Sequence, residues 1–221
     1  MMNLREELFN NQDLKYKQFH SKLVPNISND KIIGVRVPIL RKIAKQAFKE
    51  NAENLCVYYE EQVVRGLTIG MKKCSAEEHI EDIKAFVPLI DNWATCDICS
   101  SSFKFVKKNQ DDYFDFLVSY IDKSEFETRF GIVMLMDFYL DDKYIDIVLD
   151  ILKSVKSEYY YVNMAVAWAL SVAFVKYEDK VTEILKAKIL SKDVQNKTIQ
   201  KIKDSFRVSK EIKKNLNQYK M

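Results

Sequence analysis

Apolar residues recur every three to four positions along almost the whole chain, in blocks separated by short polar or turn-forming stretches. This spacing is typical of helices that bury one face, and no stretch shows the strict alternation of a strand. The predicted helices cover residues 4–23 (one or two helices), a helix with Pro38 at its first position, and residues 55–61, 63–73, 76–90, 93–106, 111–121, 125–140, 143–156, 159–176, 180–190, 193–206 and 209–219.

Five of the apolar blocks repeat with a period of about 36 residues: 63–73, 93–106, 128–140, 163–175 and 196–208. A period of this length is typical of stacked helical pairs, because a single pair cannot bury its apolar face alone. The sequence therefore predicts an all-α fold, a curved superhelical solenoid of antiparallel helix pairs. No linker rich in Pro, Gly or Ser divides the chain, so one domain is expected over residues 1–221.

Stacking in register predicts one concave wall that carries Trp93, Asp97, Arg129, Trp168 and Lys201. Trp93 and Asp97 are four residues apart and share a helix face. A carboxylate beside an indole could stabilise a cationic group and orient a water molecule. The alternative is that the indoles pack in the core, Asp97 is a surface or capping acid, and Arg129 forms a surface salt bridge.

Charge is distributed unevenly along a chain whose net charge is only +3. Residues 186–221 contain eleven Lys/Arg and three Asp/Glu, a local excess of eight positive charges. Such a basic end suits contact with phosphate groups, and Lys197 and Lys201 lie inside a repeat rather than in a tail. The alternative is a solvated terminal cap.

Composition argues against a membrane-spanning, secreted or disulfide-rich protein. No apolar run approaches the roughly 18–20 residues that span a bilayer, so no membrane partner is expected. The start of the chain lacks the long apolar stretch of a signal peptide. Four cysteines in 221 residues do not form a disulfide framework. A reduced, cytoplasmic protein is the simplest interpretation.

Few residues in this sequence are suited to metal or cofactor chemistry. Cys96 and Cys99 have the C-x-x-C form, but no second cysteine pair follows, and a zinc site is not expected. No glycine-rich phosphate loop is present, and no cofactor is predicted. His20 and His79 are expected at the surface, and the tyrosines 159–161 are expected to pack between helices.

Several short motifs in a fixed order carry a resemblance to a known family. They are Gly34-Val35-Arg36-Val37-Pro38, Asp91-Asn92-Trp93-Ala94-Thr95-Cys96-Asp97, Thr128-Arg129-Phe130-Gly131, Asn163-Met164-Ala165-Val166-Ala167-Trp168 and Asn196-Lys197-Thr198-Ile199-Gln200-Lys201. Together they resemble the HEAT-like-repeat DNA glycosylases of alkylation repair, the AlkD-like proteins. The resemblance covers nearly the whole chain.

The resemblance implies duplex DNA bound in a concave basic face and removal of cationic alkylpurines without a deep base-flipping pocket. By position, Asp97 would be the catalytic carboxylate, Trp93 and Trp168 the aromatic neighbours of the lesion, and Arg129 a contact to the DNA backbone. The partner is then double-stranded DNA carrying alkylated purines, with no obligate protein partner. Two alternatives are a non-catalytic DNA-binding relative and a helical scaffold for protein interactions.

One departure concerns the N-terminal helix that active members of the family use to enter the minor groove. Some relatives lack this helix and are not known to excise bases. Here residues 14–30 are interrupted by Pro25 and are not predicted to form such a basic helix.

Overall fold

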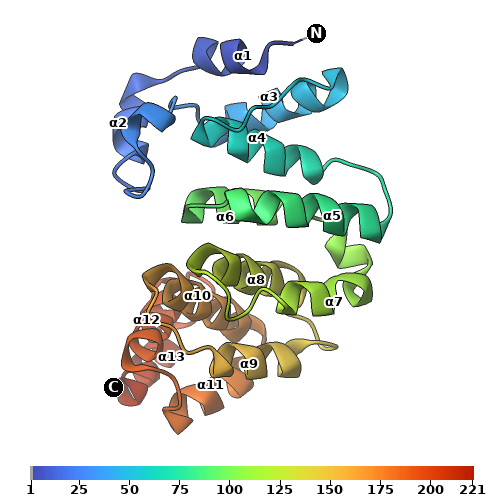
Figure 1. The fold of residues 1–221 in the computed structure, drawn as a ribbon. Helices are drawn as coiled ribbons and strands as arrows, with labels where there is room; N and C mark the ends of the chain where they lie inside the picture. Colours follow the sequence, from blue (N-terminus) through green and yellow to red (C-terminus); the bar gives the residue numbers. More distant parts are fainter. Residues whose placement is uncertain (1) are drawn as a thin grey trace. The chain divides into compact units, whose positions relative to one another are not determined.

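Residues 2–221 are the part of the chain that the computed structural model describes, and they contain thirteen α-helices, four 3-10 helices and no strand (Figure 1). The α-helices are α1 (Leu4–Asn10), α2 (Leu14–His20), α3 (Val37–Glu50), α4 (Tyr59–Ile69), α5 (Ala76–Phe86), α6 (Trp93–Ser100), α7 (Gln110–Val118), α8 (Glu125–Phe138), α9 (Ile145–Ser154), α10 (Tyr160–Lys176), α11 (Glu178–Ala187), α12 (Lys192–Asp204) and α13 (Lys210–Asn215). The 3-10 helices are η1 (Asn29–Lys31), η2 (Val87–Leu89), η3 (Val106–Lys108) and η4 (Leu216–Tyr219). The all-α prediction is confirmed.

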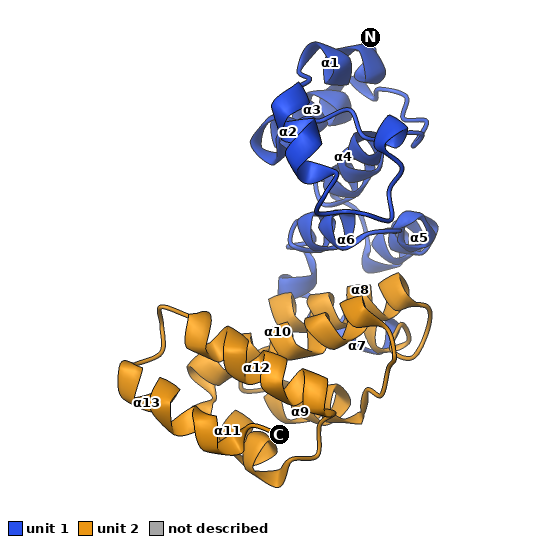
Figure 2. Cartoon of the chain, turned by 90° about the vertical axis from the view of Figure 1, so that its left-hand side faces the viewer, with its two compact units in different colours: residues 1–116 blue, residues 117–221 orange. Residues whose placement is uncertain are grey.

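The chain forms two compact units, unit 1 with residues 1–116 and unit 2 with residues 117–221 (Figure 2). Each unit has its own apolar core. Tyr59 and Phe86 are among the largest fully buried side chains of unit 1, and Phe130 and Phe174 have this position in unit 2. One continuous domain over the whole chain stays a prediction.

The five repeated apolar blocks correspond to α4, α6, α8, α10 and α12. In unit 1, α4 packs against α3, α5 and α6; in unit 2, α10 packs against α8, α9, α11 and α12. Helix α10 buries residues over most of its circumference, including Val162, Ala165, Ala169 and Phe174, and leaves the face with Trp168 partly exposed. Such a mostly buried apolar helix is expected inside a stack of helices. We call α4, α6, α8, α10 and α12 the second helices of the predicted pairs. Second helices pack on one another within each unit, as the prediction of stacked helical pairs requires.

Helices α4 and α6 approach closely at Gly66. A Cβ atom at this position would lie 2.4 Å from Cys99 Sγ and 2.6 Å from Phe86 Cζ, so only glycine fits. Cys96 and Cys99 are both fully buried, and burial raises the pKa of the Cys99 thiol. The C-x-x-C pair thus belongs to the core of unit 1.

The helix predicted over residues 55–61 is absent, and α4 begins only at Tyr59. Cys56 has a φ of +51°, in the left-handed region. The carboxylate of Glu61 accepts hydrogen bonds from the backbone N–H groups of Val57 and Tyr58 and so caps the helix. Because the N–H groups of Val57 and Tyr58 bind the Glu61 side chain, the helix does not continue toward residue 55.

Other predicted boundaries shift by a few residues. Pro38 is the second residue of α3, which begins at Val37. The block 93–106 is helical only to Ser100, and 3-10-like turns then lead to η3. The apolar spacing continues through such turns, which is why it could not show the end of the helix.

Both histidines are buried, so their predicted surface positions were wrong. His20 lies between Tyr16 and Tyr59, with ring centroids 5.4 and 4.9 Å away. His79 stacks on Phe105 at 3.6 Å. Burial lowers the pKa of both imidazoles. Aromatic partners from distant parts of the chain make these positions apolar.

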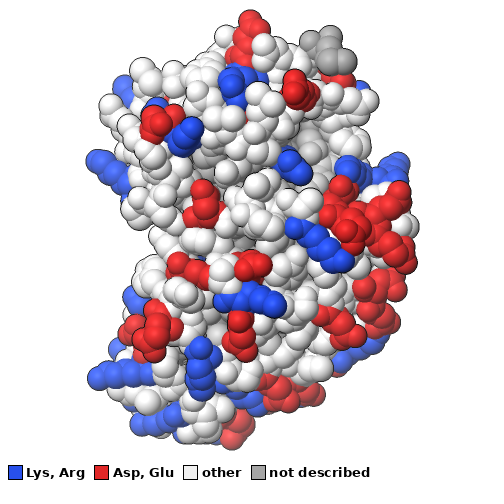
Figure 3. Space-filling model, viewed as in Figure 1, with Lys and Arg blue, Asp and Glu red and all other residues white. Residues whose placement is uncertain are grey.

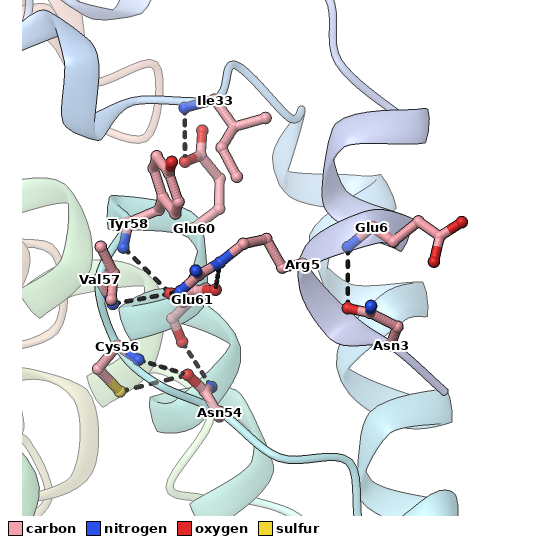
Figure 4. Close-up of polar contacts among 10 residues, drawn as sticks. All are labelled: Asn3, Arg5, Glu6, Ile33, Asn54, Cys56, Val57, Tyr58, Glu60 and Glu61. Carbon is pink, nitrogen blue, oxygen red and sulfur yellow. Dashed lines mark hydrogen bonds and ion pairs between the residues drawn. The ribbon is translucent and has the colours of Figure 1, made fainter. Parts of the chain in front are cut away.

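Two adjacent carboxylates of α4 attach the N-terminal part of unit 1 (Figure 4). Glu61 accepts hydrogen bonds from Arg5 Nε and Nη2 at 2.8 and 3.2 Å, which fixes α1 against α4. Glu60 is fully buried and accepts backbone N–H groups of Ile33, Gly34 and Val35 at 2.9, 2.6 and 3.2 Å. Burial raises the pKa of Glu60, and these hydrogen bonds oppose that shift.

The segment held by Glu60 in turn positions α2. Gly34 has a φ of +101°, and a Cβ there would lie 2.6 Å from Lys17 Cβ, so glycine is required. Its carbonyl accepts a hydrogen bond from Asp13 N. Arg36 forms an ion pair with Asp13 at 2.9 Å and covers the Tyr16 ring. The motif around Gly34 is therefore the attachment point of α2.

We expect Glu60→Gln to lower the free energy of unfolding by about 1–3 kcal/mol, because the amide NH₂ would face at least one buried N–H donor of residues 33–35. Chemical denaturation measures this difference. Glu81→Gln, at an exposed ion pair with Lys84, is the control and should change stability by less than about 0.5 kcal/mol. Equal stability of Glu60→Gln and wild type would contradict the role of Glu60.

Candidate nucleic-acid interface

The first candidate residues stand at the start of α6, where Asn92 is the N-cap. Asn92 is fully buried, and its Oδ1 accepts a hydrogen bond from Thr95 N at 2.8 Å. Its Nδ2 donates to Thr95 Oγ1 and Asp91 Oδ1, both at 2.8 Å. A buried, fully bonded cap fixes the first turn of the helix. Trp93 is consequently held as the first helical residue.

Trp93 and Asp97 lie one turn apart on the part-exposed face of α6. Both are half-buried, while Cys96 and Cys99 on the opposite face are fully buried. Their predicted common helix face is confirmed. The indole and the carboxylate are thus both accessible at one surface of unit 1.

The N-terminal segment is hydrogen-bonded to this part of α6. Trp93 Nε1 donates to the carbonyl oxygen of Leu23 at 2.8 Å, and Asn26 Nδ2 donates to the carbonyl oxygen of Asp91 at 2.6 Å. The segment after α2 therefore lies directly beside Trp93. The sequence did not show these contacts, because their partners are 65 to 70 residues apart.

Helix α2 itself presents an apolar and basic surface. Leu14 and Phe19 are 63% and 60% exposed, Lys15 is exposed as well, and Lys22 is exposed in the turn that follows the helix. Residues 14–20 thus form a helix, and the irregular stretch begins only after it. The interruption expected at Pro25 is present, but the residues before it are helical.

The remaining candidates belong to unit 2. Arg129, in the first turns of α8, is only 5% exposed, and its Nη1 donates to the carbonyl oxygen of Tyr161 at 2.9 Å. This hydrogen bond joins α8 to the start of α10. Contact between Arg129 and a DNA phosphate stays a prediction. Tyr159 and Tyr160 are 53% and 60% exposed, so the expected packing of these two rings between helices was wrong.

Trp168 and Lys201 line one surface hollow in unit 2, together with Asp204, Ser205 and Arg207. Its volume is about 350 Å³. The structure therefore brings two of the predicted site residues together. Lys197 is exposed one turn before Lys201 on α12. That the groups on unit 1 and unit 2 form one surface stays a prediction.

The charges of the two units gather on particular helices (Figure 3). Lys and Arg side chains collect over α12 and α13 of unit 2, at the lower left of the view. Acidic side chains collect over α5 of unit 1, where Glu77, Glu78, Glu81 and Asp82 line a second hollow. The hollow beside Trp168 is lined by Lys201 and Arg207 against one acid, Asp204, and this excess of positive charge suits an anionic partner.

Helices packed in pairs, without any strand in residues 2–221, define an all-α protein of the helical-repeat kind. Residues 4–204 match the family described as DNA alkylation repair enzyme. The chain belongs to this family, whose substrate is DNA. No curated protein and no solved structure matches the chain. Within residues 2–221, no helix is both long and apolar enough to cross a bilayer.

Replacing Trp93 by Phe keeps an aromatic ring and removes the donor to the Leu23 carbonyl. We expect amide hydrogens of residues 21–27 to exchange about fivefold faster, because a net hydrogen bond is worth about 1 kcal/mol. Hydrogen exchange read by mass spectrometry measures this rate. Trp168→Phe, in unit 2, is the control and should leave residues 21–27 unchanged. Identical exchange in Trp93→Phe and wild type would exclude this anchoring.

Proposed function

We propose that this protein binds duplex DNA and hydrolyses the N-glycosidic bond of cationic alkylpurines. The observation that supports this proposal best is the half-buried Trp93–Asp97 pair on one face of α6, in a chain that belongs to the DNA alkylation repair enzyme family. Such a pair offers a carboxylate and an electron-rich ring to the same ligand.

The chemistry requires little from the protein beyond a negative charge and a positioned water molecule. Alkylation of a ring nitrogen makes the purine a cationic leaving group, and cleavage transfers positive charge to the sugar. Asp97 would stabilise that charge and accept the proton of a water molecule that attacks C1′. The base leaves with the electron pair of the glycosidic bond and becomes neutral.

The other predicted residues have supporting roles in this proposal. Trp93 and Trp168 would place ring faces near the cationic base or sugar. Arg129 would contact the DNA backbone, and Lys197 and Lys201 would contact phosphates farther along the duplex. Lys201 lines the hollow at Trp168 together with Arg207, which supports the assignment of Lys201.

Asp97→Asn is expected to reduce release of 7-methylguanine from methylated DNA by at least about 100-fold, because the amide neither accepts the proton nor carries the charge. Released base is quantified by chromatography at low salt. DNA affinity should stay equal or increase, since a negative charge is lost. Asp146→Asn, at an exposed ion pair on α9, is the matched control and should retain activity. Undiminished release by Asp97→Asn would disprove the assignment.

A second candidate is a member of the family that binds DNA without excising bases. Two observations favour it. The indole N–H of Trp93 is already bonded to Leu23 O, and Arg129 is buried and bonded to Tyr161 O. Measurable duplex binding by wild-type protein without any base release would select this candidate.

Both candidates predict a salt-dependent contact at Lys201. We expect Lys201→Ala to reduce the slope of log K against log salt concentration by about 1, because one phosphate contact is lost. Fluorescence anisotropy of a labelled duplex at several salt concentrations measures the slope. Lys180→Ala, which removes an exposed ion-pair partner of Asp146, should leave it unchanged. The same slope for Lys201→Ala and wild type would place Lys201 outside the interface.

A further inference from the structure

The phenyl ring of Phe206 is fully exposed between α12 and α13. Its relative exposure is 104%, whereas the other exposed large apolar side chains of the described residues have values from 38% to 63%. Single apolar residues at a surface are common, but they usually bury part of their area against neighbours. Phe206 buries none, so the fold itself does not require this ring.

The turn that carries Phe206 is short and fixed at both ends. Ser205 follows α12, and its N–H donates to the carbonyl oxygen of Ile202 at 3.2 Å. Its Oγ accepts a hydrogen bond from Arg207 N at 3.2 Å. Val208 is buried, and Ser209 caps α13 by accepting from Ile212 N at 3.3 Å. The backbone that carries Phe206 is therefore held in place, while the ring itself lies in solvent.

The turn that carries Phe206 borders the hollow that contains Trp168. Ser205 and Arg207, the two neighbours of Phe206 in the chain, both line the hollow with Trp168 and Lys201. Residues 201–214 contain six Lys/Arg and two Asp/Glu. An exposed ring in a segment rich in cations matches a polyanion with apolar faces between its charges, and a base stack between phosphates has these properties.

We propose that Phe206 is an apolar wedge that inserts between base pairs of duplex DNA while Lys201 and Arg207 contact the adjacent phosphates. This inference rests on the proposed DNA binding and adds an apolar contact to it. Phe206 lies beyond residues 4–204, the part of the chain that matches the family. Insertion of such side chains unstacks a base step and bends the duplex.

The wedge has a distinct signature, because a neutral ring adds affinity without releasing counterions. We expect Phe206→Ala to weaken binding roughly five- to thirtyfold, as expected for loss of one ring–base stacking contact. The slope of log K against log salt concentration should not change, in contrast to Lys201→Ala. Phe206→Trp should restore the affinity. Because the ring is fully exposed, the melting temperature of Phe206→Ala should equal that of wild type.

The experiment uses full-length protein and a duplex of about 20 base pairs that contains 2-aminopurine, whose fluorescence rises when it is unstacked. Anisotropy gives the affinity and 2-aminopurine emission reports insertion in the same titration. Ile147→Ala, which truncates another exposed apolar residue of unit 2 on α9, is the matched control and should behave like wild type.

The outcomes separate the two proposals. Loss of affinity and of the emission increase in Phe206→Ala alone supports the wedge. Equal affinity and emission for Phe206→Ala and wild type overturn it and leave DNA binding intact. Absence of duplex binding by wild-type protein at about 50 mM salt, where phosphate contacts are strong, overturns the proposed function and the wedge together.

Discussion

Within each unit, the close packing of α4 on α6 and of α8 and α12 on α10 is the constraint on which the rest of this structure depends. In unit 1, α4 and α6 meet at Gly66 with no space for a Cβ atom. In unit 2, α10 is buried over most of its circumference because α8, α9, α11 and α12 pack against it. Burial of this kind stabilises the helices. Trp93, Asp97, Trp168 and Lys201 are among the side chains of these helices that stay half-exposed, so they lie at a surface that a ligand can reach.

A second constraint links the N-terminal part of unit 1 to the candidate site. The Glu60 carboxylate accepts a hydrogen bond from Gly34 N, and the Gly34 carbonyl accepts one from Asp13 N at the start of α2. The Leu23 carbonyl, in the segment after α2, accepts the indole N–H of Trp93. These are mostly hydrogen bonds to backbone groups, whose geometry is more restricted than that of apolar contacts. A displacement of residues 21–27 must therefore either move Trp93 or break its hydrogen bond. The N-terminal segment consequently sets the orientation of one proposed site residue.

The sequence predicted those features that depend on spacing alone. The 36-residue period located the second helices, because each must present an apolar face to two neighbours. The four-residue spacing placed Trp93 and Asp97 on one face. Features that depend on distant partners were not predicted: the bond of Arg129 to Tyr161 O spans 32 residues, and His79 is buried by Phe105 and Tyr113. Phe206 was expected as the last residue of a helix, whereas α12 ends at Asp204, because the apolar pattern does not show where this helix ends.

The proposed chemistry is compatible with a shallow site. A neutral purine must be protonated as it leaves, which requires a general acid close to the base and usually an enclosing pocket. An alkylated cationic purine already carries that charge, so an anionic group near the sugar and ring faces near the cation are sufficient. Asp97 at the surface of α6 and Trp168 at the border of an open hollow are groups of this kind. Selectivity would then follow from the charge of the lesion itself, because an uncharged adduct gains nothing from either group and remains bonded to its sugar.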